Sequence, residues 1–176
     1  MLLGLVGSEM CIRDRDSGLF TNESKTSWAT QVGLTKDQWA VSGMVNLKYK
    51  GWADEYFSTA GGDDRSGSST NYGLRAWWRP AESGPAVPEV SFVYDYSVVD
   101  GYSTNDTTDM YFVGLTWLDM FNPDDRIGLA FGQPQMRENT GAEPFMYEVY
   151  YGFKVNDSIT VTPAIFGATN ANGTDG

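Results

Sequence analysis

Apolar and polar side chains alternate along much of the chain with a period of two residues. The clearest case is residues 39–49, where the odd positions carry Trp, Val, Gly, Val, Leu and Tyr and the even positions carry Ala, Ser, Met, Asn and Lys. Successive side chains of a β-strand point to opposite sides of a sheet. This alternation therefore predicts a strand with one apolar face and one polar face.

The same pattern predicts eight strands, some from weaker matches, and hence an all-β fold. Their ranges are 28–34, 39–49, 72–78, 90–96, 111–117, 127–131, 147–155 and 159–165. The links near 35–36, 80–87, 119–125 and 156–157 are short or medium, whereas 51–69, 99–108 and 133–144 are longer and rich in Gly, Ser, Thr, Asn and Asp. Short turns at one end and long loops at the other are typical of an up-and-down outer-membrane β-barrel.

The positions of the aromatic residues favour a membrane barrel over a soluble sandwich, which also alternates. If successive strands run in opposite directions, one aromatic set falls near the short turns: Trp39, Trp78, Trp117 and Phe153. A second set falls near the long loops: Tyr49, Tyr72, Tyr96, Tyr111 and Tyr147. Amphipathic rings prefer the headgroup zone on each side of a bilayer. We therefore expect two aromatic girdles in contact with outer-membrane lipid.

The polar faces supply the candidate pore-lining residues, because the interior of a wide barrel is a water-filled channel whose charges bias which solutes pass. The candidates are Lys48, Lys50, Arg75, Trp77, Arg79, Glu89, Asp95, Glu148, Tyr150 and Lys154. Arg75 lies mid-strand between Gly73 and Trp77. The rings of Trp77 and Tyr150 offer flat surfaces for a sugar. The alternative interpretation of each charge is a solvated group that only keeps the wall wet.

Charge and composition exclude several other functions. The net charge of −11 argues against a nucleic-acid partner, which needs a basic surface. The chain has no His, the commonest general base and metal ligand, and only one Cys. We expect no catalytic residues, no cofactor and no metal. The acidic loop residues lack the spacing of a calcium loop and are interpreted as solvated: Asp54, Glu55, Asp63, Asp64, Asp124 and Asp125.

The first fifteen residues are expected to be foreign to the protein. Residues 5–15 resemble the in-frame translation of a transposase adapter used in sequencing libraries, and the match is unbroken. A signal peptide is the alternative, but the segment has no basic start and Glu9 interrupts its apolar stretch. Residues 1–15 contain two acidic and two basic side chains, so the net charge is unchanged without them.

Longer stretches of the chain resemble a known family. Residues 112–117 (FVGLTW), 128–134 (GLAFGQP), 147–164 (YEVYYGFKVNDSITVTPA) and 74–80 (LRAWWRP) are similar to the cyanobacterial branch of the carbohydrate-selective porins, also described as iron uptake porins. The resemblance implies a bacterial outer-membrane location and a barrel of about sixteen strands, of which residues 16–176 would form about half, incomplete at both ends. It also implies an export signal and a cell-wall-binding segment that are missing here, and it leaves a homo-oligomer open.

The expected function is therefore that of a porin, a passive aqueous channel for small hydrophilic solutes such as sugars, inorganic ions or iron species. One alternative is a secreted, soluble, glycan-binding β-sandwich, which would use the many Trp and Tyr residues. Another is a glycoside hydrolase, which needs two carboxylates held across one sugar. Glu138 and Glu143 fall in a predicted loop without a rigid strand partner, so we expect no enzyme activity.

Overall fold

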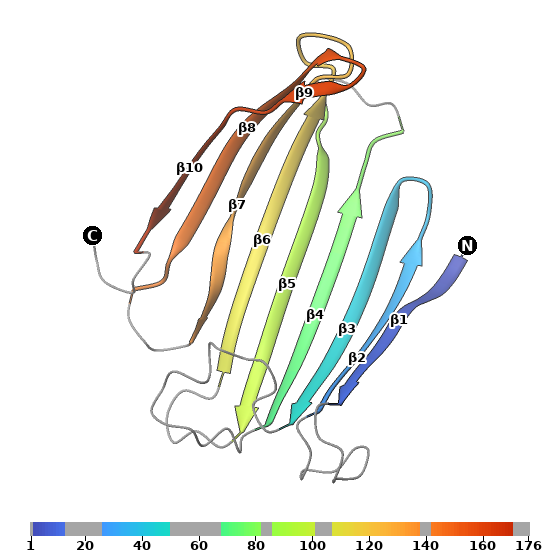
Figure 1. The fold of residues 1–176 in the computed structure, drawn as a ribbon, viewed down its shortest axis with the longest axis vertical. Coiled ribbons are helices and arrows are strands. Elements are labelled where there is room, and N and C mark those ends of the chain that lie inside the picture. Colours follow the sequence, from blue (N-terminus) through green and yellow to red (C-terminus); the bar gives the residue numbers. More distant parts are fainter. Residues whose placement is uncertain are drawn as a thin grey trace.

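In the computed structural model, the chain forms one antiparallel sheet (Figure 1). The structure describes residues 2–12, 26–49, 68–81, 86–100, 107–137 and 142–170. Its strands are β1 (Leu2–Ile12), β2 (Thr26–Thr35), β3 (Trp39–Tyr49), β4 (Ser68–Trp78), β5 (Glu89–Asp100), β6 (Thr107–Leu118), β7 (Arg126–Arg137), β8 (Phe145–Asn156), β9 (Ile159–Val161) and β10 (Ala164–Thr169).

The topology is an up-and-down meander. Strands β1 to β8 lie beside one another in chain order, followed by β10, while β9 pairs with the end of β8. Strands β1 and β10 lie at opposite edges, so the sheet is not closed within the described part of the chain (Figure 1). The links 36–38, 79–88, 119–125 and 157–158 share one end of the sheet, here called the turn end. The predicted all-β, antiparallel, up-and-down arrangement is confirmed.

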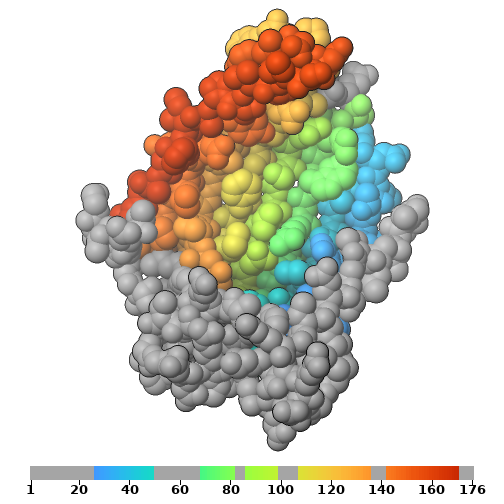
Figure 2. All heavy atoms as spheres, viewed as in Figure 1, coloured from blue at the N-terminus to red at the C-terminus, as the bar shows by residue number. Residues whose placement is uncertain are grey.

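The register places the apolar positions of neighbouring strands on the same side of the sheet. Trp39 in β3 pairs with Trp78 in β4, which pairs with Val90 in β5. The row continues through Leu115 and Leu129 to Val149 in β8. We call this side the apolar face and the opposite side the polar face. Side chains of adjacent strands cover the side seen in Figure 2 as one continuous surface.

Most strands are longer than the alternation predicted, and two of the predicted long loops are correspondingly shorter. The β5–β6 link is 101–106 instead of 99–108, and the β7–β8 link is 138–144 instead of 133–144. The added strand residues are mostly polar. They join the ladder because backbone N–H and C=O groups pair regardless of the side chain.

The last predicted strand, 159–165, is divided into β9 and β10. Between them, the carbonyl oxygen of Pro163 accepts a 3.1 Å hydrogen bond from the backbone N–H of Tyr151. Proline has no N–H of its own to donate, so the ladder is interrupted at this residue. Both short strands nevertheless pair with β8, which makes them one interrupted neighbour of that strand.

Strand β1 falls within residues 1–15, which are expected from the sequence to be foreign. It pairs antiparallel with β2 along ten residues, with a register shift between Leu5 and Gly7. An exposed strand edge is a template for any extended segment, because the pairing groups belong to the main chain. The pairing does not distinguish native from foreign sequence, and the expectation about residues 1–15 stays a prediction.

Within the described ranges, no helix has both the length and the apolar character needed to cross a bilayer.

Candidate functional site

The structure brings the candidate pore-lining residues to one side of the sheet. The register and the alternation place the following on the polar face: Lys48, Arg75, Trp77, Glu89, Asp95, Glu148, Tyr150 and Lys154. Arg79 follows the end of β4, and its guanidinium lies 4.5 Å from the centre of the Trp77 ring. Lys50 is outside the described residues. Residues far apart in sequence thus share one surface.

Hydrogen bonds between polar side chains cross the strands on this face. Gln31 Nε2 donates to Ser42 Oγ at 2.8 Å, which joins β2 to β3. Ser27 Oγ donates to Asn46 Oδ1 at 3.2 Å, and Asn71 Nδ2 donates to the Asn46 carbonyl oxygen at 3.3 Å. Side chains that bond to one another in this way form a hydrophilic wall while remaining in contact with water.

Charges of both signs are distributed along the polar face. Arg75 is exposed in the middle of β4 and pairs in register with Ser42 and Val93. Asp95 lies beside Gly73, where a Cβ would come within 2.6 Å of its Oδ1. At the turn end, Lys154 forms ion pairs with Asp124 at 3.5 Å and Asp157 at 3.3 Å. Lys154 is therefore tied to the turns at the rim of this face.

The β6–β7 turn contains a carboxylate that sequence reasoning misjudged. Asp125 was interpreted as solvated, but its residue is only 1% exposed. Its oxygens accept hydrogen bonds from the N–H groups of Met120, Phe121 and Asn122 at 2.8, 3.1 and 2.9 Å, and from the Tyr151 hydroxyl at 2.9 Å. Asp125 is a structural residue of the turn: it binds backbone groups left without partners by the tight reversal of the chain.

These hydrogen bonds also determine the acidity of Asp125. Burial, the largest single influence, would raise the pKa of the carboxyl group, because it penalises the charged form. The four donors stabilise the carboxylate and together outweigh burial, so the pKa lies below its ordinary value of 3.8. Asp119 and Asp124 in the same turn adopt positive φ angles of 54° and 67°, which Asp tolerates better than most residues.

The aromatic residues expected near the short turns lie at the turn end of the apolar face. Trp39 and Trp78 pair directly across β3 and β4, and Trp117 pairs with Ile127. Phe153 stacks on Tyr151 with a centroid distance of 5.7 Å. Two members of this cluster were not predicted: Tyr151, and Phe121, which meets it edge to face at 5.9 Å and is 71% exposed.

The tyrosines expected near the long loops lie on the apolar face toward its opposite end. Tyr72 pairs with Tyr96, and Tyr111 pairs with Tyr94, which was not among the expected girdle residues. Tyr147 pairs with Phe131, whose ring centre lies 6.3 Å from that of Phe145. Tyr49 ends β3 opposite Thr26. The apolar face is thus bounded by aromatic residues at both ends.

Both aromatic boundaries are displaced in the same direction across the sheet. The row of paired residues that starts at Trp39 in β3 reaches Val149 in β8, five strands further on. The boundary residue of β8, Phe153, lies four residues beyond Val149 toward the turn end. At the other boundary, Tyr49 lies ten residues from this row, whereas Tyr147 lies only two residues from it. The ends of the strands step in the same direction from β3 to β8 in Figure 1.

The displacement corresponds to a definite strand tilt. The two boundaries shift by four and eight residues over five strands, an average of roughly 1.2 residues per strand. Each residue advances about 3.3 Å along its strand, and neighbouring strands lie about 4.8 Å apart. The boundary at the turn end is therefore inclined by roughly 30° to the hydrogen-bond direction and the opposite boundary by roughly 50°, with a mean of roughly 40°. Strands in closed barrels are tilted from the barrel axis by about 35–45°.

No three His, Cys, Asp or Glu side chains in the described ranges form a group that could hold a metal ion. Of the two glutamates considered for hydrolysis, Glu138 is outside the described residues, and Glu143 lies two residues before β8.

Comparison with known proteins gives a relative without a stated function. Over 109 residues the chain is 33% identical to Uncharacterized protein alr4550 of Nostoc sp. (strain PCC 7120 / SAG 25.82 / UTEX 2576), and the match covers 58% of this chain. It covers 18% of the relative, so the chain spans less than a fifth of that protein's length. No family model matches the chain, and no solved structure matches it.

Proposed function

We propose that this chain is part of the wall of a bacterial outer-membrane porin, a β-barrel that conducts small hydrophilic solutes passively. The observation that carries the proposal is the apolar face with its two displaced aromatic boundaries. A bilayer perpendicular to the barrel axis crosses tilted strands obliquely, so the residues at each headgroup zone must shift from strand to strand. The mean shift of the two boundaries corresponds to the tilt that barrels have.

The height of the apolar face matches a membrane band in β3, whereas the aromatic residues lie closer together in β4, β6 and β8. Trp39 and Tyr49 are ten residues apart in β3, which is roughly 33 Å along the strand and about 25 Å along an axis tilted by 40°. The corresponding separation in β4, β6 and β8 is six residues, or about 15 Å along that axis. The apolar band of outer-membrane barrels is about 25 Å tall, with aromatic residues at its edges.

Exposure of the apolar face favours the barrel over a soluble sandwich. The following apolar-face residues are each more than a third exposed: Val32, Val45, Tyr72, Leu74, Trp78, Tyr94, Tyr147, Val149 and Ile165. A sandwich would cover such a face with a second sheet about 10 Å away. All strands of the described residues belong to a single sheet layer. In the proposed porin, lipid chains cover this face.

The opposite face has the properties of a channel wall. Its charges have both signs, its hydroxyl and amide side chains bond to one another, and it lies on one side of a continuous sheet. A barrel of about sixteen strands leaves a lumen wide enough for water and small solutes. Lys48, Arg75, Arg79, Asp95 and Lys154 would then contribute to the field that selects among ions and sugars.

Conductance of the full-length protein containing this chain, purified in detergent and added to a planar lipid bilayer, tests the proposal. We expect discrete current steps whose size scales with the salt concentration, as for a water-filled channel. A protein that folds into detergent micelles and resists denaturation there, but never raises the conductance of the bilayer, would contradict the porin function.

A further inference from the structure

The polar face contains a hollow that the sequence pattern did not reveal. Strand β7 contributes small residues to this face, including Ala130 and Gly132, while its neighbours β6 and β8 contribute large ones. The hollow above these small residues has a volume of about 450 Å³. Sites for small molecules commonly have volumes of about 300–1,000 Å³.

The register explains why the hollow forms. Gly132 pairs with Phe112 on one side and Met146 on the other, and Ala130 pairs with Glu148, which pairs in turn with Phe166 in β10. The Tyr150 ring lies across Gly128, where a Cβ would collide with it. Tyr150 therefore closes the hollow toward the turn end, and the small residues of β7 form its floor.

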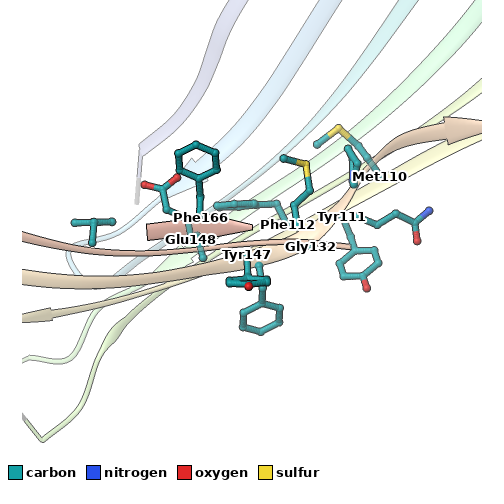
Figure 3. A pocket seen from close by; sticks show the side chains of 13 residues that line it. Met110, Tyr111, Phe112, Gly132, Tyr147, Glu148 and Phe166 are labelled. Atoms are coloured by element: carbon teal, nitrogen blue, oxygen red, sulfur yellow. The ribbon is translucent and has the colours of Figure 1, made fainter. Parts of the chain in front are cut away.

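The rim of the hollow is apolar, although it lies on the polar face. Phe112 and Met146 are 39% and 46% exposed inside the sheet, Phe166 is 77% exposed in the edge strand β10, and Met110 also lines the hollow. Figure 3 shows Met110, Phe166 and Glu148 on one side of the sheet and Tyr147 on the other. A channel wall needs no exposed aromatic and thioether groups to remain wet, so this cluster requires another explanation.

The single charge of the rim limits what the hollow can bind. Glu148 is the only ionisable carboxylate or base among the lining residues, and no residue in the described ranges forms an ion pair with it. On this face, the lining offers a solute the Glu148 carboxylate and the Tyr150 hydroxyl as polar side-chain groups. A neutral sugar would leave most of its hydroxyls without protein partners. A cation on a hydrocarbon body would satisfy the carboxylate and contact the rings and the methionines.

The geometry points to a subsite for amphipathic organic cations in this hollow, meaning an ammonium group carried on an aromatic or short alkyl body. The ammonium group lies against Glu148, and the hydrocarbon body lies between Phe112, Met146 and Phe166 over Ala130 and Gly132. The inference rests on the proposed function, because it requires the polar face to line a channel that solutes enter. It adds a solute class that the strand pattern alone did not predict.

Block of the channel by phenyltrimethylammonium tests this inference. The probe is titrated into one chamber of a planar bilayer that contains the full-length protein, and the concentration that halves the current is measured. We expect saturable block. Glu148→Gln should raise the half-blocking concentration about fivefold, as for a partly exposed ion pair, and Phe112→Ala about two- to fivefold. Glu89→Gln removes another carboxylate of the same face outside the hollow and should weaken the block by less than about twofold, through the field of the channel alone.

Two further probes separate the possible results. Benzenesulfonate, which has the opposite charge, and sucrose, a neutral sugar, should not block in the same concentration range. Block by sucrose without block by phenyltrimethylammonium would overturn the cation subsite, and so would cation block that Glu89→Gln weakens as much as Glu148→Gln does. A conducting channel without cation block overturns this inference alone, whereas a protein without conductance overturns the proposed function and the subsite with it.

Discussion

Replacing Val45 by Arg puts a charge near the middle of the apolar face. Val45 lies six residues from Trp39 and four residues from Tyr49 in β3. At a tilt of about 40°, these separations are roughly 15 Å and 10 Å along the barrel axis. The side chain is 36% exposed in the sheet, so an Arg at this position has room to extend away from the strand.

The expected cost depends on what covers the apolar face. If lipid covers it, Arg near the bilayer midplane should lower the free energy of unfolding by about 2–4 kcal/mol. If water covers it, the change should be within about 0.5 kcal/mol, as for most surface substitutions. Met44→Arg provides the matched control, because it places the same side chain one residue away on the polar face, where the cost should stay within about 1 kcal/mol.

The free energies are measured by folding the full-length protein and both variants into lipid vesicles and titrating with guanidinium chloride. Heat-dependent migration in gel electrophoresis reports the folded fraction at each concentration. The reasoning is refuted if Val45→Arg unfolds at the same denaturant concentration as the unmodified protein, or if Met44→Arg is the more damaging of the two.

Three other substitutions test separate parts of the structure. In vesicles, Gly132→Ala should lower the free energy of unfolding by about 1–3 kcal/mol, because its Cβ would collide with the β6 backbone at Tyr111 and Phe112. The control Gly43→Ala, whose Cβ would have nothing within 4 Å, should be neutral or slightly stabilising. Equal effects of the two substitutions would contradict the close approach of the backbone at Gly132. Asp125 has a folded-state pKa below the ordinary 3.8, so its stabilising contribution is present above pH 3.8 and is lost as the pH falls through the lowered pKa. Unfolding midpoints measured between pH 7 and pH 2 should therefore show a smaller acid loss for Asp125→Asn, and an unchanged acid loss would exclude this role. Arg79→Gln should raise the cation-to-anion permeability ratio of the channel roughly twofold, as measured from its reversal potential. Lys36→Gln removes a cation that lies 5.6 Å from the Trp39 ring in the β2–β3 turn, and it should change the ratio less. The opposite order would place Arg79 outside the conducting path.

The strands were predictable because each carries its own signal. Alternation in residues 39–49 needs no knowledge of the neighbours, and it matches β3 from end to end. The common side of the apolar faces followed from the same signal, since a shift of one residue would expose every apolar side chain to the wrong environment. Strand ends were less predictable: residues 97–100, which extend β5 to Asp100, do not continue a clear alternation and are paired through their backbone, which no side-chain pattern records.

Features that depend on several strands at once were not predictable. The burial of Asp125 arises from a turn folded around its carboxylate and from Tyr151 in β8, 26 residues away. The hollow requires the register that puts small residues of β7 between Phe112 and Met146. The sequence did contain one usable signal, the repetition of Gly128, Ala130 and Gly132 at alternate positions of one strand. Such a run predicts close contact or open space above the strand.

Accessibility of single cysteines along β3 tests most directly whether lipid covers the apolar face. Cys11 is the only cysteine of this chain, and replacing it together with any cysteine elsewhere in the full-length protein provides a clean background for one new cysteine at each of residues 40–47. A nitroxide on each cysteine is relaxed by oxygen, which concentrates in lipid, or by a nickel chelate, which stays in water. We predict that positions 41, 43, 45 and 47 respond to oxygen and that positions 40, 42, 44 and 46 respond to the chelate. The proposal is contradicted if both sets respond to the chelate alike, or if the odd-numbered set is shielded from both reagents, as it would be under a second sheet.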